Sequence, residues 1–106
     1  MYIRFGEEYL EELFISGKCS DKKHRLQPAV VKNYIKCVRF LSELKQIEDI
    51  YPYKGMNFEV LTGDKKGVCS VRINIQYRLE FTLDTDQAVE PVVTVCTLLD
   101  ITNHYK

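Results

Sequence analysis

Apolar and polar positions alternate most regularly between residues 59 and 81. Residues 70–74 (Ser-Val-Arg-Ile-Asn) alternate in this way, and residues 77–81 (Tyr-Arg-Leu-Glu-Phe) do so again almost at once. A glycine-punctuated turn, residues 63–67, comes just before them. Two short alternating runs joined by a short loop are typical of a β-hairpin. We therefore predict a hairpin in this stretch.

The register of this hairpin decides which side chains share a face. A two-residue loop at Ile75 and Gln76 would set apolar residues opposite polar ones. A loop with an odd number of residues, or a bulge, separates the two kinds, so we predict the odd loop. The apolar face then carries Val71, Ile73, Leu79 and Phe81, and the polar face carries Arg72, Asn74, Arg78 and Glu80.

This register places Arg72 and Arg78 close together on an open face of the sheet. Like charges repel each other unless an anion or a carboxylate lies between them. Glu80 could supply that carboxylate. Two interpretations therefore stay open: surface arginines balanced by Glu80 and solvent, and a pair of arginines that binds an anion.

The first half of the chain has helical rather than alternating periodicity. Residues 1–5 alternate weakly and predict one short strand. Residues 7–15 predict a helix that ends at Gly17, with an apolar stripe on one side and glutamates on the other. Residues 18–25 are basic and aperiodic, which indicates a loop. A longer helix is predicted from Pro28 to Ile47.

The remaining stretches complete the predicted fold. Residues 52–55 break the helix, residues 58–61 predict a short strand, and residues 84–87 predict a polar turn. The β-branched run at residues 92–99 does not alternate, which is typical of a central strand covered on both sides. The long helix is expected to cover the apolar face of the hairpin and to leave the opposite face of the sheet uncovered.

This order predicts an α+β fold. We expect a two-layer sandwich in which an N-terminal strand and two helices pack on one face of a twisted, mainly antiparallel sheet. At 106 residues and 45% apolar composition, the chain has the length and core of a single domain, residues 1–106. A second domain is not expected.

Composition excludes several classes of protein. No apolar run approaches the ~20 residues that span a bilayer, and residues 1–7 lack the apolar stretch of a signal peptide, so we expect a cytoplasmic protein without a membrane partner. The four cysteines are far apart, without the close pair that begins a zinc site or a redox motif. We expect reduced thiols, no metal and no cofactor at Cys19, Cys37, Cys69 and Cys96.

The net charge is zero, but the charges are unevenly distributed. Residues 16–39 carry a net charge of +6 and residues 65–82 carry +3, while each of the three remaining segments carries −3. Such segments can form a basic patch on a neutral protein, which is what a phosphate backbone would contact. Solvated helix faces would produce the same distribution.

The predicted order, together with residues 61–67 (Leu-Thr-Gly-Asp-Lys-Lys-Gly), residues 70–74 and Tyr77-Arg78, resembles the HigB branch of the RelE/ParE toxin superfamily. The resemblance spans essentially the whole chain and implies the RelE/ParE-like fold. It also implies a toxin of a type II toxin–antitoxin pair that inhibits translation as a ribosome-dependent mRNA endonuclease. The implied partners are the ribosome, mRNA and a HigA-like helix-turn-helix antitoxin, with no small-molecule substrate.

Metal-independent RNA cleavage needs three kinds of group. A base takes the proton from a 2′-hydroxyl, cations stabilise the pentacovalent phosphorane, and an acid protonates the leaving 5′-oxygen. The resemblance implies His104 as acid or base, because HigB toxins end in a catalytic Asp-Tyr-His string. The order differs here, where Asp100 precedes His104 and Tyr105. The alternative is that His104 is a terminal residue without a role.

The other candidate residues come from the hairpin and the two basic segments. Arg72 and Arg78 are the transition-state cations, although one of them could simply bridge Glu80 or Glu90. Glu59 occupies a position before the Gly-Asp turn that is histidine in some HigB toxins, and a carboxylate can act as a base. Tyr105 could orient the base or stack on a nucleobase. Candidate RNA contacts, each with solvation as the alternative, are Lys65, Lys66, Lys22, Lys23 and Arg25.

Two rival functions follow from the same residues. A ParE-like toxin would poison DNA gyrase by binding it, and its toxicity would not depend on His104 or Tyr105. A non-toxic module that only binds an antitoxin is suggested by Glu59, where histidine would be expected. The presence of Arg72, Arg78, His104 and Tyr105 argues against such a decayed toxin.

Overall fold

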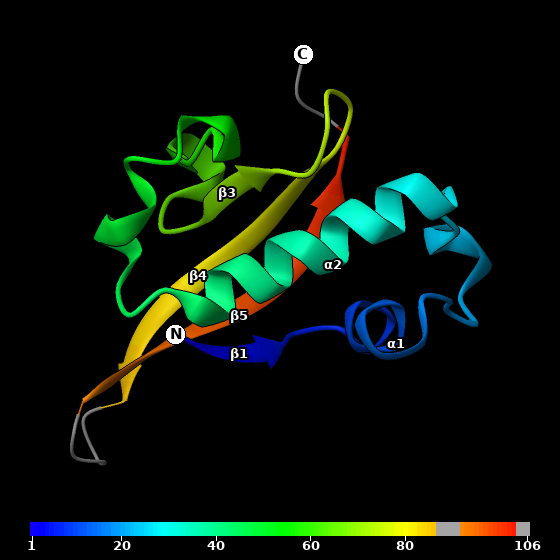
Figure 1. Ribbon diagram of the computed structural model, residues 1–106, viewed down its shortest axis with the longest axis horizontal. Helices are drawn as coiled ribbons and strands as arrows, with labels where there is room; N and C mark the ends of the chain where they lie inside the picture. Colours follow the sequence, from blue (N-terminus) through cyan, green and yellow to red (C-terminus); the bar gives the residue numbers. More distant parts are fainter. Residues whose placement is uncertain (87–91, 104–106) are drawn as a thin grey trace.

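The computed structural model of the chain describes residues 1–86 and 92–103 (Figure 1). The described strands form one sheet in the order β1-β5-β4-β3-β2, in which β1 and β5 are parallel and the other neighbours are antiparallel. The strands are β1 (Tyr2–Phe5), β2 (Glu59–Val60), β3 (Cys69–Arg72), β4 (Arg78–Asp86) and β5 (Val93–Thr102). The helices are α1 (Glu8–Ser16) and α2 (Pro28–Glu43).

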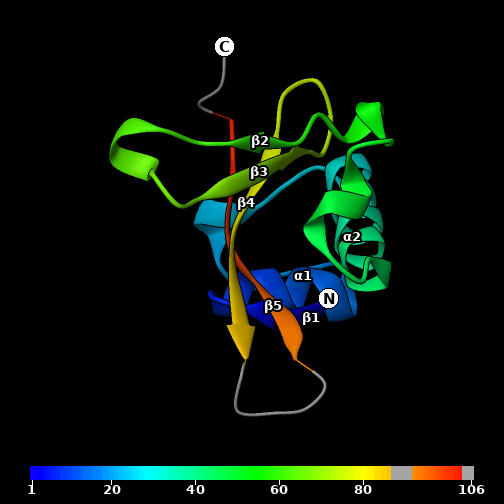
Figure 2. The same ribbon diagram turned by 90° about the vertical axis from the view of Figure 1, so that its left-hand side faces the viewer.

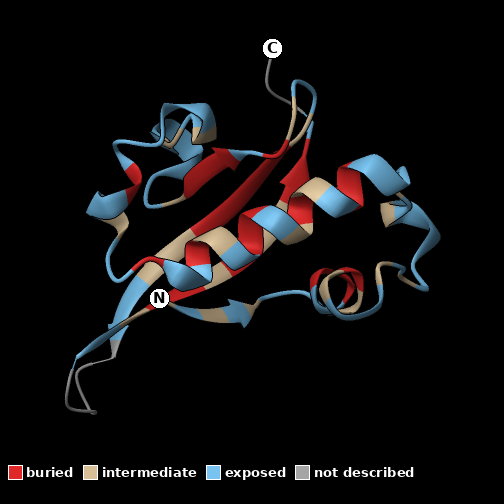
Figure 3. Cartoon of the chain, in the orientation of Figure 1, coloured by how far each residue is buried: buried red, intermediate tan, exposed pale blue. Residues whose placement is uncertain are grey.

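The two helices pack on the mixed sheet, which confirms the predicted α+β class. In Figure 1, α2 runs along β4 and β5 while α1 lies next to β1, and Figure 2 shows the sheet from its edge with α2 on one side. Buried residues of both helices and of β3, β4 and β5 form one apolar core (Figure 3). The largest fully buried side chains include Tyr34, Phe81 and Leu10.

The predicted hairpin register is confirmed. Val71 is paired with Leu79 and Arg72 with Arg78, so the loop has an odd number of residues. Asn74 stabilises this loop because its side-chain Oδ1 accepts hydrogen bonds from the backbone N–H groups of Gln76 at 2.8 Å and Tyr77 at 2.7 Å. An asparagine that bonds its own backbone a few residues ahead is a common way to close a turn.

The first helix follows its prediction, and the second is shorter than predicted. Helix α1 ends at Gly17, whose left-handed backbone (φ 75°) allows its N–H to donate to the carbonyl of Leu13. Helix α2 ends at Glu43 rather than at Ile47, because Leu44 has an extended backbone. Leu44 is still buried in the core after the helix ends, and a short 3₁₀ turn, Ile47–Ile50, places the side chain of Ile50 in the same core.

Other boundaries also differ from the predictions. The turn predicted at residues 84–87 is wrong for Asp84, Thr85 and Asp86, which pair with β5 as part of β4; Gln87 lies outside the described residues. The basic loop contains a 3₁₀ turn, Lys22–His24, capped by the carboxylate of Asp21. Backbone pairing and capping of this kind do not require any apolar period, so the sequence pattern did not reveal them.

A bulge lies near the C-terminal end of β5. Glu80 pairs with Asp100 while Phe81 pairs with Leu98, so Leu99 is an extra residue in β5. The extra residue lets Leu98 and Ile101 both face the helices. The prediction of full cover on both sides is wrong in part, because Val93 is exposed and Thr97 and Leu99 are only partly buried.

The face of the sheet away from α2 is not uncovered, contrary to prediction. Ser70, Arg78, Glu80 and Thr102 are all buried there. Part of the cover comes from the segments around β2: Lys65 lies against Glu80, and the carbonyl of Asn57 contacts Arg78. Short connecting segments, which have no apolar period of their own, thus bury a polar layer.

The cysteines are free thiols, and three of them belong to the core. Burial raises the pKa of Cys37 to about 11 and that of Cys96 to about 12, and it also raises the pKa of Cys69. These thiols are therefore protonated at neutral pH and act as small apolar side chains. Within the described residues, no helix has the length and apolar character needed to cross a membrane.

Candidate active site

Three residues predicted to be catalytic line one cleft of about 310 Å³, which we call the arginine cleft. It lies at the end of the sheet formed by β2, β3 and the β3–β4 loop. Its residues are Asn57, Glu59, Arg72, Asn74, Ile75, Gln76 and Arg78. The structure thus brings Glu59 together with Arg72 and Arg78, although they come from different strands.

Strand register accounts for this grouping. One polar row crosses four strands: Glu59 of β2 pairs with Ser70 of β3, and Glu80 of β4 pairs with both Ser70 and Asp100 of β5. In the next polar row, Arg72 is opposite Arg78 and Arg78 is opposite Thr102. Residues two apart on a strand share a face, so both rows lie on the same side of the sheet. The end of β5 is therefore placed next to the arginine pair.

Arg78 is held firmly within the fold. Its side chain is 7% exposed, its Nε donates to Ser70 Oγ at 3.0 Å, and its Nη2 donates to the carbonyl of Asn57 at 2.5 Å. A buried guanidinium with several hydrogen bonds is fixed in orientation. Arg78 therefore supplies a stationary positive charge at the wall of the cleft.

Arg72 differs from Arg78 in exposure and bonding. It is exposed, and no side chain or carbonyl within residues 1–86 and 92–103 forms a hydrogen bond or ion pair with its guanidinium. It directly faces Arg78 across the β3–β4 pair. Two adjacent guanidinium groups, one fixed and one available, are suited to bind an anionic group such as a phosphate.

The lysines of the β2–β3 turn have separate environments. Lys65 Nζ lies 2.7 Å from Glu80 Oε2, and the Glu80 side chain is only 7% exposed. Lys65 therefore balances a buried carboxylate. Lys66 is exposed on the same turn, where a polyanion could reach it.

Asp100 is not part of the arginine cleft. Its Oδ1 accepts a hydrogen bond from the hydroxyl of Tyr9 and one from the backbone N–H of Ile101 at 2.9 Å. Burial, followed by the bond to Asp100, raises the pKa of Tyr9 well above its ordinary value, so this hydroxyl keeps its proton. Tyr9 thus connects α1 to β5. The sequence showed Tyr9 only as one apolar position of a helix and did not predict this role.

The basic loop lies near the same end of β5. Lys23 and Arg25 line a small hollow of about 190 Å³ together with Tyr77 and Asn103, while Lys22 is exposed nearby. His24 stacks on Tyr9 with ring centroids 3.7 Å apart, and its Nδ1 lies 2.8 Å from Asp21 Oδ2. The hydrogen bond from His24 lowers the pKa of Asp21.

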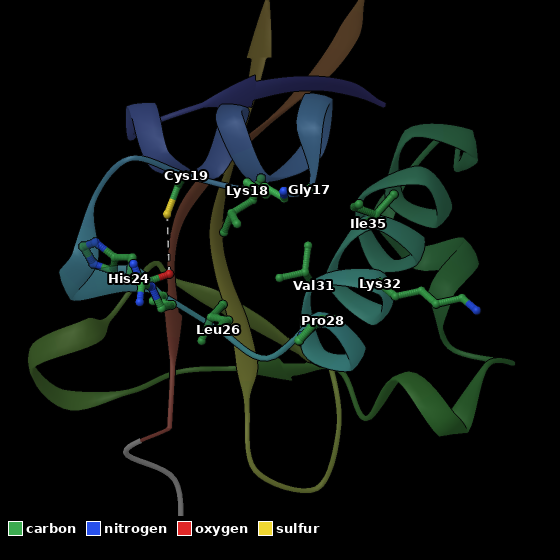
Figure 4. A pocket seen from close by; sticks show the side chains of 11 residues that line it. Gly17, Lys18, Cys19, His24, Leu26, Pro28, Val31, Lys32 and Ile35 are labelled. Atoms are coloured by element: carbon green, nitrogen blue, oxygen red, sulfur yellow. Dashed lines mark hydrogen bonds between the residues drawn. The ribbon is translucent and has the colours of Figure 1, made fainter.

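A larger hollow lies elsewhere, between the two helices and the basic loop (Figure 4). It has a volume of about 510 Å³ and an apolar floor that includes Leu26, Val31 and Ile35. Figure 4 also shows the contact between the Cys19 thiol and the carbonyl of His24, at 3.6 Å. Of the predicted site residues that the structure describes, only Arg25 lines it, and it shares no lining residue of the described chain with the arginine cleft.

His104 and Tyr105 lie outside the described residues, as does Glu90. The structure therefore places five predicted residues on the hairpin and the segment that leads into it, Asp100 on β5, and three on the basic loop, without testing the C-terminal pair. Ser70 and Asn57, which hold Arg78, are not among the predicted site residues. Asn57 has a left-handed backbone (φ 47°), a conformation that asparagine tolerates. An asparagine just after Gly55 and Met56 was therefore the sequence feature that could have indicated a turn at this position.

Comparison with known proteins agrees with this fold. The family model of the RelE-like toxin of the type II toxin–antitoxin system HigB matches residues 3–94. The chain is 35% identical over 82 residues to Toxin HigB-1 of Vibrio cholerae serotype O1 (strain ATCC 39315 / El Tor Inaba N16961), covering 76% of this chain and 82% of that protein. A YoeB/ParE toxin from Agrobacterium tumefaciens has a similar fold, with a TM-score of 0.61, 16% identity, and coverage of 99% and 100% of the two chains.

The fold and the sequence together define a RelE/ParE-superfamily toxin. More narrowly, the chain belongs to the HigB-like family of type II toxin–antitoxin systems. It is accordingly a toxin of the mRNA interferase class, which inhibits translation, and its family implies an antitoxin partner.

Proposed function

We propose that this toxin is a metal-independent endoribonuclease that cuts mRNA on the ribosome, with the scissile phosphate bound in the arginine cleft. The observation that carries the proposal is the pairing of Arg72 with Arg78 beside Glu59 in one cleft. Thr102 is the cross-strand neighbour of Arg78, so β5 ends next to the same cleft. His104 and Tyr105 follow two and three residues later in the sequence.

In the proposed reaction, a base removes the proton from the 2′-hydroxyl, and the 2′-oxygen attacks the adjacent phosphorus. Arg72 stabilises the charge that develops on the phosphorane oxygens, while Arg78 contributes the fixed field of its buried guanidinium. The bond to the 5′-oxygen then breaks as an acid protonates it. The products carry a 2′,3′-cyclic phosphate and a 5′-hydroxyl.

Glu59 and His104 are the proposed proton-transfer groups. Glu59 is exposed at the mouth of the cleft, where its carboxylate can accept a proton from a bound hydroxyl. His104 then acts as the acid, with Tyr105 orienting it or stacking on a base. Lys66 and the basic loop, with Lys22, Lys23 and Arg25, contact ribosomal or messenger phosphates. Lys65 supports the site indirectly by neutralising Glu80.

The proposed partner is a HigA-like helix-turn-helix antitoxin, and the proposed location is the cytoplasm, where ribosomes and mRNA are found. Primer extension on a reporter mRNA after brief induction tests the activity. We expect cuts within codons for the wild type and none for the His104→Ala, Tyr105→Ala double variant. Growth arrest without cleavage by either protein would contradict the proposal and direct attention to gyrase or another target.

A further inference from the structure

Two exposed tyrosines lie beside the arginine cleft on the segment between α2 and β2. Tyr51 is 61% exposed and Tyr53 is 55% exposed. With Ile50, Lys54, Asn57 and Phe58 they line a depression of about 270 Å³, which we call the aromatic hollow. Exposed aromatic rings around a hollow need an explanation, because aromatic side chains usually contribute most when they are buried.

Both tyrosine rings are held in place. Tyr51 makes a perpendicular ring contact with Phe58 at 6.0 Å between centroids, and Tyr53 makes one with Phe40 at 4.9 Å. Phe58 is anchored in turn against Phe81 of the core at 6.4 Å. The rings are thus oriented in advance while each tyrosine remains exposed, which lowers the entropy lost when a planar ligand stacks on them.

The aromatic hollow is connected to the arginine cleft through Asn57. This residue lines both depressions, and its carbonyl accepts the hydrogen bond from Arg78 Nη2. This contact holds Asn57, at the border of the two depressions, directly against Arg78. Asn57 is therefore the residue that a chain molecule occupying both depressions would cross.

The chemistry of the combined surface matches a single-stranded nucleic acid. Arg72 supplies an available cation, Lys54 adds an exposed one at the hollow, and the tyrosines supply aromatic faces. Cations that follow a backbone, alternating with aromatic rings on which bases stack, are the features of single-strand recognition. A protein ligand would gain less from the cationic cleft that continues this surface.

We propose that the aromatic hollow binds an unstacked nucleobase of the RNA strand whose phosphate lies in the arginine cleft. This inference rests on the proposed function of the cleft and extends it by a base-binding subsite at Tyr51 and Tyr53. Stacking is tolerant of base identity, so the subsite holds the strand in position without reading its sequence.

The test measures binding of a short, fluorescein-labelled, 2′-O-methyl RNA, which cannot be cleaved because its 2′-oxygen is blocked. We expect the Tyr51→Ala, Tyr53→Ala double variant to bind about tenfold more weakly than the wild type. The Tyr51→Phe, Tyr53→Phe double variant should bind as the wild type does, because phenylalanine also stacks. Tyr2→Ala is the matched control, since Tyr2 is 64% exposed on β1 and lines neither depression.

A second readout identifies stacking directly. A 2-aminopurine placed at successive positions of the same RNA should be quenched at one position by the wild type and the phenylalanine variant, but not by the alanine variant. If the alanine variant binds and quenches like the wild type while Arg72→Ala weakens binding, the subsite is wrong and the cleft stands. If Arg72→Ala and the alanine variant both leave RNA binding unchanged, both proposals fail. Loss of antitoxin binding alone would identify a protein surface and overturn the subsite.

Discussion

Arg72 and Arg78 show how two identical residues in one cross-strand pair acquire different roles. Arg78 is buried and bonded to Ser70 and to the carbonyl of Asn57, whereas Arg72 is exposed. The sequence pattern placed both on one polar face and left open which of them would be committed within the fold. Which arginine is buried depends on the loop that carries Asn57, because its carbonyl accepts a hydrogen bond from Arg78. This loop has no apolar periodicity in the sequence, so only the structure distinguishes the two arginines.

Replacing Arg78 should therefore affect stability, and replacing Arg72 should not. Arg78→Ala leaves the buried Ser70 hydroxyl and the Asn57 carbonyl without their donor, and we expect it to lower the free energy of unfolding by about 2–4 kcal/mol. Arg72→Ala should change it by less than about 0.5 kcal/mol. Urea unfolding followed by circular dichroism measures both values. Equal effects of the two substitutions would contradict the assigned roles.

Protonation of the buried thiols predicts a dependence of stability on pH. The pKa of Cys37 is raised from its ordinary value of 9.0 to about 11 and that of Cys96 to about 12, so the folded chain holds these protons more tightly than the unfolded chain. Their contribution to stability is complete below pH 9 and is lost as the pH rises toward 11–12, at about 1.4 kcal/mol per pH unit for each thiol.

The thiol contribution is measured as a difference between variants. Under reducing conditions, the free energy of unfolding of the wild type should fall more steeply between pH 9 and pH 11 than that of Cys96→Ala. Cys19→Ala is the control, because Cys19 is only partly buried. Identical slopes for the wild type and Cys96→Ala would show that burial does not hold this proton.

At the scale of elements, the hairpin was the most predictable part of the fold. Its register follows from the alternation of residues 70–74 and 77–81, because only an odd loop separates apolar from polar side chains. The end of α2, the extension of β4 and the bulge at Leu99 were not predictable, since each depends on tertiary partners rather than on a local period. Glu59 was predicted as a site residue only because the chain resembles HigB toxins. The pairing of β2 with β3 explains why Glu59 lies next to the two arginines.

The β3–β4 loop should control the position of both arginines. Asn74→Ala removes the acceptor for the N–H groups of Gln76 and Tyr77, and we expect it to destabilise the chain by about 1–2 kcal/mol. Asn74→Asp keeps an acceptor oxygen and should recover most of this loss. Gln76→Ala is the matched control, as Gln76 bonds Asn74 through its backbone. Thermal unfolding of the four proteins tests this, and an unaffected Asn74→Ala variant would refute it.

At the scale of the whole molecule, function depends on how charge is distributed and not on its total. The net charge is zero, yet the two positive segments of the sequence both reach the β3–β4 loop. Arg72 and Arg78 line the arginine cleft beside this loop. Lys23 and Arg25 line the small hollow of about 190 Å³ that Tyr77 also lines. The strand order brings both next to the end of β5. The two segments come together because of the strand order. The charge of each segment does not show this, so the sequence was equally consistent with charges spread over a solvated surface.

The proposed activity places phosphoryl transfer in the arginine cleft. Its most direct test is end-group analysis of mRNA cut by the purified toxin, with and without programmed ribosomes. We expect 2′,3′-cyclic phosphate ends that require ribosomes, with cleavage reduced at least about a hundredfold by Arg72→Ala and unchanged by Arg39→Ala, an exposed arginine on α2. Full activity of Arg72→Ala, or products with 5′-phosphate ends, would contradict the account.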